Sequence, residues 1–217
     1  NQFRYIENLK KPLCFLINQI DHEKADYENT LMSLKEIYGG KVIPIQYPIG
    51  IGASFSAIVD VLKQKMYKFK EGAATPEILE IPASEKEHAD KLYKALLEVA
   101  AENDEKLMEK YFEQGTLSED EMRAGIQVGM INRDIYPVFV ASAEKNWAVH
   151  RIMNFLNIAA PAPNQMPASI NTNNQEVKVD ANAPTSLFFF KTTVEPHIGE
   201  VSYFKVMSGK VKEGDDL

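Results

Sequence analysis

The sequence has 217 residues, 45% apolar and 25% charged, with 24 Lys and Arg against 31 Asp and Glu for a net charge of −7. This apolar fraction excludes a wholly disordered chain, and 11 glycines without a repeat exclude a collagen-like fibre. The longest apolar runs are about a quarter of the roughly 20 residues that span a bilayer, so we expect no membrane partner. The single cysteine, Cys14, has no partner for an intramolecular disulfide, so we expect a cytoplasmic protein.

The first forty residues follow a helix–strand–helix pattern. Residues 2–10 are predicted to be the end of a helix that Pro12 stops, and residues 13–17 form a continuous apolar run of the kind that buried parallel strands show. An amphipathic helix is predicted over 26–38, and Gly39-Gly40 is its expected end. This order is typical of an α/β domain.

The pattern then changes to short extended stretches separated by glycine-rich turns, of which Gly50 to Ser54 is one. The extended stretches are expected at 42–47, 55–61, 65–69 and 77–81. Three helices follow. The first and third are expected to begin with the capping boxes Ser84 with Glu87 and Ser118 with Glu121, and the second to begin at Asn103 or Asp104.

Much of the negative charge lies in this middle part. Between Glu71 and Glu121, 15 acidic residues outnumber 5 lysines, and apolar residues recur among them at helical spacing. A helical face turned to water is the simpler interpretation. The alternative is a surface that docks a basic protein partner by charge complementarity. The sign of the charge disfavours contact between this segment and a phosphate backbone.

The last part of the chain returns to the buried-strand pattern at 136–141 and to an amphipathic helix at 144–156. The segment 161–186 is rich in Pro, Asn and Ala and is expected to be a linker. Two further strands are predicted at 187–193 and 201–206, which indicates the beginning of an all-β module.

Polar residues follow two of the predicted buried strands. Asn18 and Asp21 come after the first strand, and Ser142 and Ala143 come after the strand that ends at Ala141. An Asp carboxylate can accept hydrogen bonds from N1–H and the exocyclic amine of guanine, and an Asn amide can reach the N7 and O6 edge. If the two strands are neighbours, the backbone N–H groups of Ser142 and Ala143 would face the same O6. This arrangement predicts selective guanine recognition at the carboxyl edge of the sheet.

Each of these signals is common by itself. Asn-x-x-Asp occurs by chance in many chains, and its simpler interpretation is a capping loop with Asp21 or Asp26 as the helix cap. His22, His88, His150 and His197 are each isolated from possible co-ligands, so we expect no metal site among them. The combination of two loops in the right order is what favours guanine binding.

The ordered motifs resemble elongation factor G, the ribosome translocase among the translational GTPases. Residues 12–21 (PLCFLINQID) are similar to its guanine-specificity segment, and 137–149 to the strand, Ser-Ala loop and helix that close its GTPase domain. Residues 46–60 and 98–111 are similar to parts of its inserted subdomain, and 187–217 to the start of its second domain.

The resemblance implies an α/β fold: the C-terminal part of a P-loop GTPase domain at 1–40 and 138–160, and an inserted acidic α/β subdomain at 41–137. A linker at 161–186 and the start of a β-barrel at 187–217 would follow. The chain begins without Met and ends where a further strand is expected, so we interpret it as an internal piece of a longer protein. The phosphate loop and the switch His would then lie upstream.

The function implied by the resemblance is that of a ribosome-dependent GTPase acting in translocation during protein synthesis. Asn18, Gln19, Asp21, Ser142 and Ala143 would bind the guanine of GTP or GDP, with Mg²⁺ held only by the upstream part. No catalytic residue is expected here, so the chain alone would not hydrolyse GTP. The expected partners are the ribosome and, through the acidic insert, its stalk protein. No sequence-specific nucleic acid is expected.

Three departures from the pattern suggest a divergent paralogue. Gln19 stands where the resemblance has Lys, Lys205 where it has Arg, and Ala148 where it has Gly, which is tolerable if the backbone there is helical. The alternative interpretation is therefore a ribosome-binding paralogue, or a ribosomal protection or recycling factor, with weakened GTP turnover.

Overall fold

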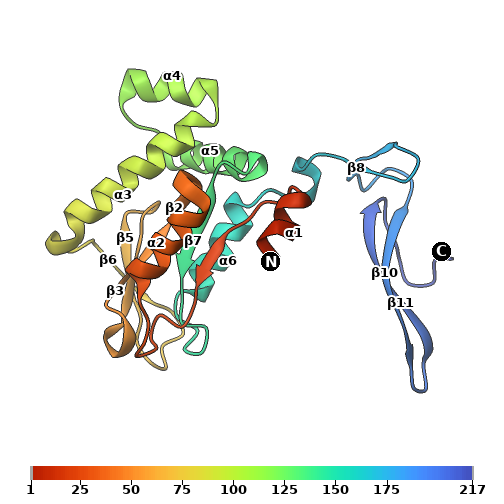
Figure 1. Ribbon diagram of the computed structural model, residues 1–217, viewed down its shortest axis with the longest axis horizontal. Coiled ribbons are helices and arrows are strands. Elements are labelled where there is room, and N and C mark those ends of the chain that lie inside the picture. Colours follow the sequence, from red (N-terminus) through yellow and green to blue (C-terminus); the bar gives the residue numbers. More distant parts are fainter. Residues whose placement is uncertain (1, 217) are drawn as a thin grey trace. The chain divides into compact units, whose positions relative to one another are not determined.

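A computed structural model describes residues 2–216 of the chain (Figure 1). The predicted segments 1–40 and 187–217 begin at Asn1 and end at Leu217, respectively. These two terminal residues lie outside the described part. The chain forms two compact units, Asn1–Pro161 and Ala162–Leu217. Between residues 2 and 216, every helix is too short or too polar to cross a lipid bilayer.

A parallel three-stranded sheet organises the first unit. Its strands are β1 (Phe15–Ile17), β7 (Tyr136–Val140) and β2 (Val42–Pro44), in the order β1-β7-β2. All five residues of the central strand β7 are buried, as a parallel strand covered on both faces requires. The prediction of a mixed α/β fold is therefore confirmed.

Two helices cover opposite faces of this sheet. Tyr136 of β7 makes an edge contact with Tyr38 of α2 (Tyr27–Tyr38), with the ring centroids 6.4 Å apart. Phe139, three residues along and therefore on the other face, contacts Phe155 of α6 (Val149–Ala159) at 4.9 Å. The helix predicted over 26–38 is confirmed. Asp26 is its N-cap residue and accepts a hydrogen bond from the Asn29 backbone N–H at 3.0 Å.

The N-terminal helix α1 (Gln2–Asn8) ends two residues earlier than predicted. It packs next to α2, because the Phe3 and Tyr38 ring centroids lie 4.2 Å apart. A short 3₁₀ helix, η1 (Gly39–Lys41), then leads from α2 into β2.

A four-stranded antiparallel sheet is the second sheet of the first unit. It consists of β3 (Gln46–Ile49), β4 (Ala57–Asp60), β5 (Lys65–Lys68) and β6 (Glu77–Leu79), with the 3₁₀ helix η2 (Gly52–Ser54) between β3 and β4. The single stretch predicted at 42–47 is wrong, because β2 and β3 belong to different sheets. Ile45 lies between them, and its N–H donates to the Val138 carbonyl at 2.9 Å. Thus β2, at the start of the predicted insert, pairs with β7, whose first two residues are the end of that insert.

The acidic segment folds into α3 (Ala83–Glu102), α4 (Glu105–Gln114) and α5 (Glu119–Asn132). The capping box of Ser118 with Glu121 is confirmed, and Asp104 caps α4. The box predicted at Ser84 is wrong. Pro82 is extended there, with a φ of −63° and a ψ of 152°, so the helix begins directly after it and Ser84 lies inside the first turn.

A glycine allows α3 and α5 to pack closely. A Cβ atom at Gly125 would lie 2.2 Å from the carbonyl oxygen of Ala100, so no larger residue fits that position without displacing a helix.

The second unit is built on a long antiparallel hairpin, β10 (Ser186–Glu195) with β11 (Gly199–Ser208). Both strands are longer than predicted. The segment expected to be a plain linker contains the 3₁₀ helix η3 (Pro163–Gln165) and the two-residue strands β8 (Ser169–Ile170) and β9 (Glu176–Val177). Pairing of short polar segments leaves little apolar periodicity, which explains why the sequence did not reveal them.

Candidate functional site

The two predicted loops lie side by side at the carboxyl edge of the parallel sheet. Asn18 follows β1 and Ser142 lies just beyond β7, and these strands are neighbours, with Ile17 opposite Val140. The backbone N–H of Ala143 donates to Asn18 Oδ1 at 3.0 Å. Residues that lie about 125 positions apart in the chain are thus joined directly.

The loop that carries Asp21 is held from two sides. Ile20 is 1% exposed; its N–H donates to the Ala141 carbonyl at 3.3 Å, and its own carbonyl accepts from the Gly52 N–H at 2.8 Å. Gly52 has a φ of 60°, and a Cβ there would lie 3.4 Å from the His22 carbonyl oxygen. The sequence identified residues 50–54 only as a turn, whereas this turn supports the candidate site.

The second loop is closed by a pair of backbone hydrogen bonds. Ser142 N–H donates to the Trp147 carbonyl at 3.2 Å, and Trp147 N–H donates to the Ser142 carbonyl at 2.9 Å. The arrangement predicted from the sequence, in which the Ser142 and Ala143 N–H groups face one ring oxygen together, is therefore wrong for Ser142. Its N–H is used to close the loop, and only the Ala143 N–H lies against the Asn18 side chain.

The helix that follows this loop begins later than the predicted residue 144. Residues 143–146 form a tight turn between the paired residues Ser142 and Trp147, and α6 begins at Val149. Ala148 has a φ of 67° and a ψ of −10°, which is left-handed and not helical, so the condition under which Ala148 would replace Gly without cost is not met.

Asp21 is the main charged group of the site. Its side chain is 15% exposed, and the Lys145 ammonium lies 3.6 Å from Oδ2. Burial raises the pKa of Asp21, but hydrogen bonds from the Ser142 hydroxyl and from its own backbone N–H, together with Lys145, outweigh this effect. The pKa therefore lies below its ordinary value, and Asp21 is a carboxylate at neutral pH.

A hollow of about 240 Å³ lies between the two loops. Its lining residues are Gln19, Asp21, His22, Glu23, Ser142, Ala143 and Glu144. The hollow offers three carboxylates, those of Asp21, Glu23 and Glu144, together with the Ser142 hydroxyl and the Ala143 backbone N–H, which donates to Asn18 at its edge. Such a set can pair with a ring that presents adjacent N–H donors and a carbonyl oxygen.

Gln19 has a left-handed backbone, with a φ of 59°, and its carbonyl accepts from the His22 N–H at 3.0 Å. The site residue missed from the sequence is Lys145, because nothing in its neighbourhood along the chain indicates that it lies against Asp21. Among residues 2–216, no group of three or more His, Cys, Asp or Glu side chains is gathered closely enough to hold a metal ion.

Comparison with known proteins bears on the fold. A scan against models of protein families finds no match. Among solved structures, a crystal structure of a protein from Thermus thermophilus is similar, with a TM-score of 0.81 and 26% sequence identity. The similarity covers 98% of this chain and 30% of that one, so the chain spans less than a third of the length of the protein it matches.

Proposed function

We propose that this chain recognises the guanine base of GTP and GDP as part of a ribosome-dependent translational GTPase similar to elongation factor G. The observation that carries the proposal is the meeting of the two strand-end loops, in which Ala143 N–H contacts Asn18 Oδ1 and Asp21 lies beside Ser142. The fold assigned by the proposal is the C-terminal half of a P-loop GTPase domain with an inserted acidic subdomain, followed by the start of a β-barrel.

In this proposal Asp21 accepts hydrogen bonds from N1–H and the exocyclic amine of guanine. The Ala143 N–H turns from Asn18 Oδ1 to the ring carbonyl, and the Asn18 side-chain NH₂ group donates to N7. Lys145 moves away from the carboxylate that it now approaches to 3.6 Å. Adenine lacks the two donors for Asp21 and leaves the carboxylate unpaired, which is the physical source of selectivity.

The acidic insert supplies the proposed contact with the stalk protein of the ribosome. Phe112 of α4 is 78% exposed, and it lines a surface hollow with Asp104, Glu105 and Glu109. An exposed aromatic ring among carboxylates suits a partner that presents both apolar and basic side chains.

Nucleotide binding to this chain tests the proposal directly. We expect GDP to bind at least about 100-fold more tightly than ADP, because two charge-assisted hydrogen bonds of about 1.5–3 kcal/mol each are lost with adenine. Asp21→Ala should remove this preference. Asp134→Ala, which removes a carboxylate of the first unit outside the candidate site, is the matched control and should preserve it. Equal binding of GDP and ADP to the unaltered chain would refute guanine recognition.

Gln19 favours a second candidate, a ribosome-binding paralogue or a protection or recycling factor with weakened turnover, because it brings no charge to the site. The measurement that separates the two is GTP hydrolysis, with and without ribosomes, by this chain joined to the upstream half that the proposal requires. Stimulation by ribosomes supports the working GTPase. Guanine-selective binding without stimulation supports the paralogue.

A further inference from the structure

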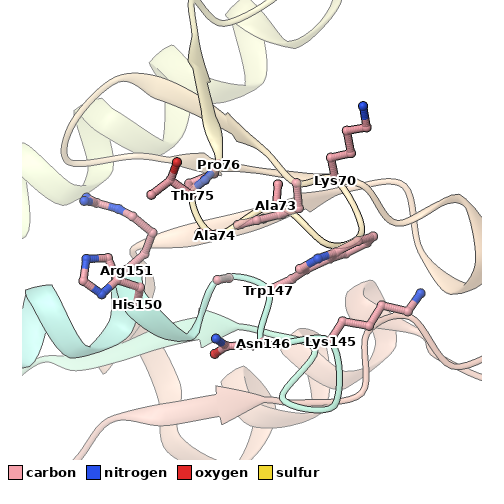
Figure 2. Close-up of a pocket in the computed structure, with 12 residues that line it drawn as sticks. Lys70, Ala73, Ala74, Thr75, Pro76, Lys145, Asn146, Trp147, His150 and Arg151 are labelled. Atoms are coloured by element: carbon pink, nitrogen blue, oxygen red, sulfur yellow. The ribbon is translucent and has the colours of Figure 1, made fainter.

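The ring of Trp147, which closes the second loop of the candidate site, packs against the antiparallel sheet. Its centroid lies 5.8 Å from that of Phe69, with an angle of 14° between the two planes, and 5.9 Å from that of Phe55. Phe55 is 2% exposed and Phe69 is 9% exposed. Figure 2 shows the Trp147 indole next to the turn that carries Lys70 and Ala73 and directly follows Phe69. We call Phe55, Phe69 and Trp147 the aromatic cluster.

The two phenylalanines of the aromatic cluster are fixed at one end of the antiparallel sheet. Phe55 lies two residues before β4, and Phe69 directly follows β5. The Phe69 N–H donates to the Ser56 carbonyl at 2.7 Å, and the two ring centroids lie 6.3 Å apart. Because β4 and β5 pair along their whole lengths, the sheet holds both rings in place independently of the loops.

This end of the sheet is connected to the loop that carries Asp21. The Phe55 N–H donates to the Gly52 carbonyl at 3.1 Å, and the Gly52 N–H donates to the Ile20 carbonyl at 2.8 Å. Ile20 directly precedes Asp21. Two successive backbone hydrogen bonds therefore lead from the aromatic cluster to the residue next to the carboxylate.

The aromatic cluster is also connected to the second loop. The Trp147 N–H donates to the Ser142 carbonyl at 2.9 Å, and Ser142 directly precedes Ala143, whose N–H contacts Asn18. Lys145 lies over the Trp147 ring, with 4.8 Å from Nζ to the centroid. Since the same ammonium group approaches the Asp21 loop, the position of this ring affects both a donor and a charge of the candidate site.

A second contact fixes the chain just after the second loop. Arg151, in the first turn of α6, donates to Asp60 Oδ2 at 2.7 Å and stacks on Tyr67, with 4.3 Å from Cζ to the ring centroid. The Arg151 and Asp60 side chains are 15% and 5% exposed, so solvent screens this ion pair little. The antiparallel sheet thus holds this segment at Trp147 and again at Arg151.

We propose that this end of the antiparallel sheet positions both loops of the guanine site, and that the members of the aromatic cluster are positioning residues for the Ala143 N–H and for Asp21. The proposal rests on the proposed function for the identity of the ligand. Binding groups on loops stay in register only when neighbouring packing limits their motion, and a ligand that must first order its loops binds more weakly. The simpler alternative is core packing without influence on the loops.

Hydrogen exchange of single amides, measured by NMR on the full chain without nucleotide, separates these two explanations. Phe69→Leu alters the sheet and leaves both loops unaltered. It should raise the exchange rates of the Ala143 and Trp147 amides by about threefold to tenfold, the range expected for the loss of one aromatic contact. The matched control is Phe155→Leu, which removes a buried ring that contacts Phe139 at 4.9 Å, and it should leave both rates unchanged.

Urea denaturation shows that both variants are folded and measures how much stability each one loses. Equal acceleration of the loop amides in Phe69→Leu and Phe155→Leu would overturn the proposal, because the loops would then respond only to the general loss of stability.

The affinity for GDP measures the consequence for binding. Phe69→Leu should bind GDP about threefold to tenfold more weakly than the unaltered chain, and Phe155→Leu should bind it equally well. Trp147→Ala should also weaken binding, whereas Trp147→Phe, which keeps a ring on the aromatic cluster, should restore most of the affinity.

The two proposals fail in different ways. Equal binding of GDP and ADP by the unaltered chain would refute guanine recognition, and the amide exchange rates would still decide whether the sheet positions the loops. A chain that prefers GDP, with the same GDP affinity in Phe69→Leu, would leave guanine recognition intact and overturn the positioning role.

Discussion

At the scale of single residues, Ala148 has a backbone conformation that alanine disfavours. Its φ of 67° lies in the left-handed region, where the Cβ atom of an L-residue approaches the backbone carbonyl. The conformation is imposed by the Ser142 and Trp147 backbone pair, which closes the loop just before α6 begins. The residue is also 2% exposed, so its methyl group is fully packed.

We expect Ala148→Gly to change the free energy of unfolding by less than about 1 kcal/mol, because relief of left-handed strain of about 1–2 kcal/mol offsets the loss of a buried methyl group, about 0.8 kcal/mol, and the greater chain entropy of glycine, about 0.4–1 kcal/mol. Urea denaturation measures the change. The control is Ala89→Gly, inside α3 with ordinary helical geometry and also fully buried, which should lower the free energy of unfolding by about 1–2 kcal/mol. An equal loss of stability in both variants would show that Ala148 is not strained.

At the scale of elements, the acidic helices are joined by a carboxylate that serves two of them. Glu121 of α5 accepts from Lys110 Nζ of α4 at 2.6 Å through Oε1, and from the Ser118 N–H and hydroxyl, both at 2.9 Å, through Oε2. The hydrogen bond from Lys110, followed by those from Ser118, lowers the pKa of Glu121 to about 2.

This depressed pKa predicts a pH dependence of stability. A carboxylate with a lower pKa in the folded than in the unfolded chain stabilises the fold above its unfolded pKa of about 4.5, and this contribution is lost as the pH falls toward about 2. Glu121→Gln should therefore be less stable than the unaltered chain at pH 6, and the difference should shrink below pH 4.5. Urea denaturation across this range measures it.

Glu113→Gln on the exposed surface of α4 is the control for this experiment, and it should show no such convergence. A stability difference between Glu121→Gln and the unaltered chain that stays constant from pH 6 to pH 3 would contradict the role assigned to the charge of Glu121.

At the scale of the whole molecule, the buried apolar cluster runs from Ile20 to Ala159 and so belongs to the first unit. In the second unit, Phe188, Phe189 and Phe190 of β10 are between 52% and 60% exposed. A hairpin with so little buried apolar surface is held mainly by its own strand pairing, which is marginal in water.

Hydrogen exchange should therefore separate the two units. We expect the backbone amides of β7 to exchange only through global unfolding, and those of β10 and β11 to exchange at least about 100-fold faster through local opening. Mass spectrometry of labelled peptides measures both in one sample. Equal protection of β7 and β10 would show that the hairpin is stabilised as strongly as the core.

The sequence by itself determined the features that depend on local spacing. The apolar run before Asn18, the cap at Asp26 and the capping box at Ser118 all act within one turn or one strand, so pattern and propensity suffice to predict them. The same holds for the identity of the two polar loops, since both directly follow apolar strands. The prediction that the first of these strands is buried is wrong, because β1 lies at the sheet edge and Leu16 is 48% exposed. Where a neighbouring proline set the backbone, as Pro82 does before Ser84, the local pattern was misleading.

Only the tertiary structure decided which distant groups meet. The approach of Lys145 to Asp21 and the support of Ile20 by Gly52 each join segments that are apart in the chain. The left-handed backbone of Ala148 likewise results from closure of the loop at Ser142. It does not result from a conformational preference of alanine. Such contacts depend on how β1, β7 and the antiparallel sheet pack, and packing is a property of the folded chain as a whole.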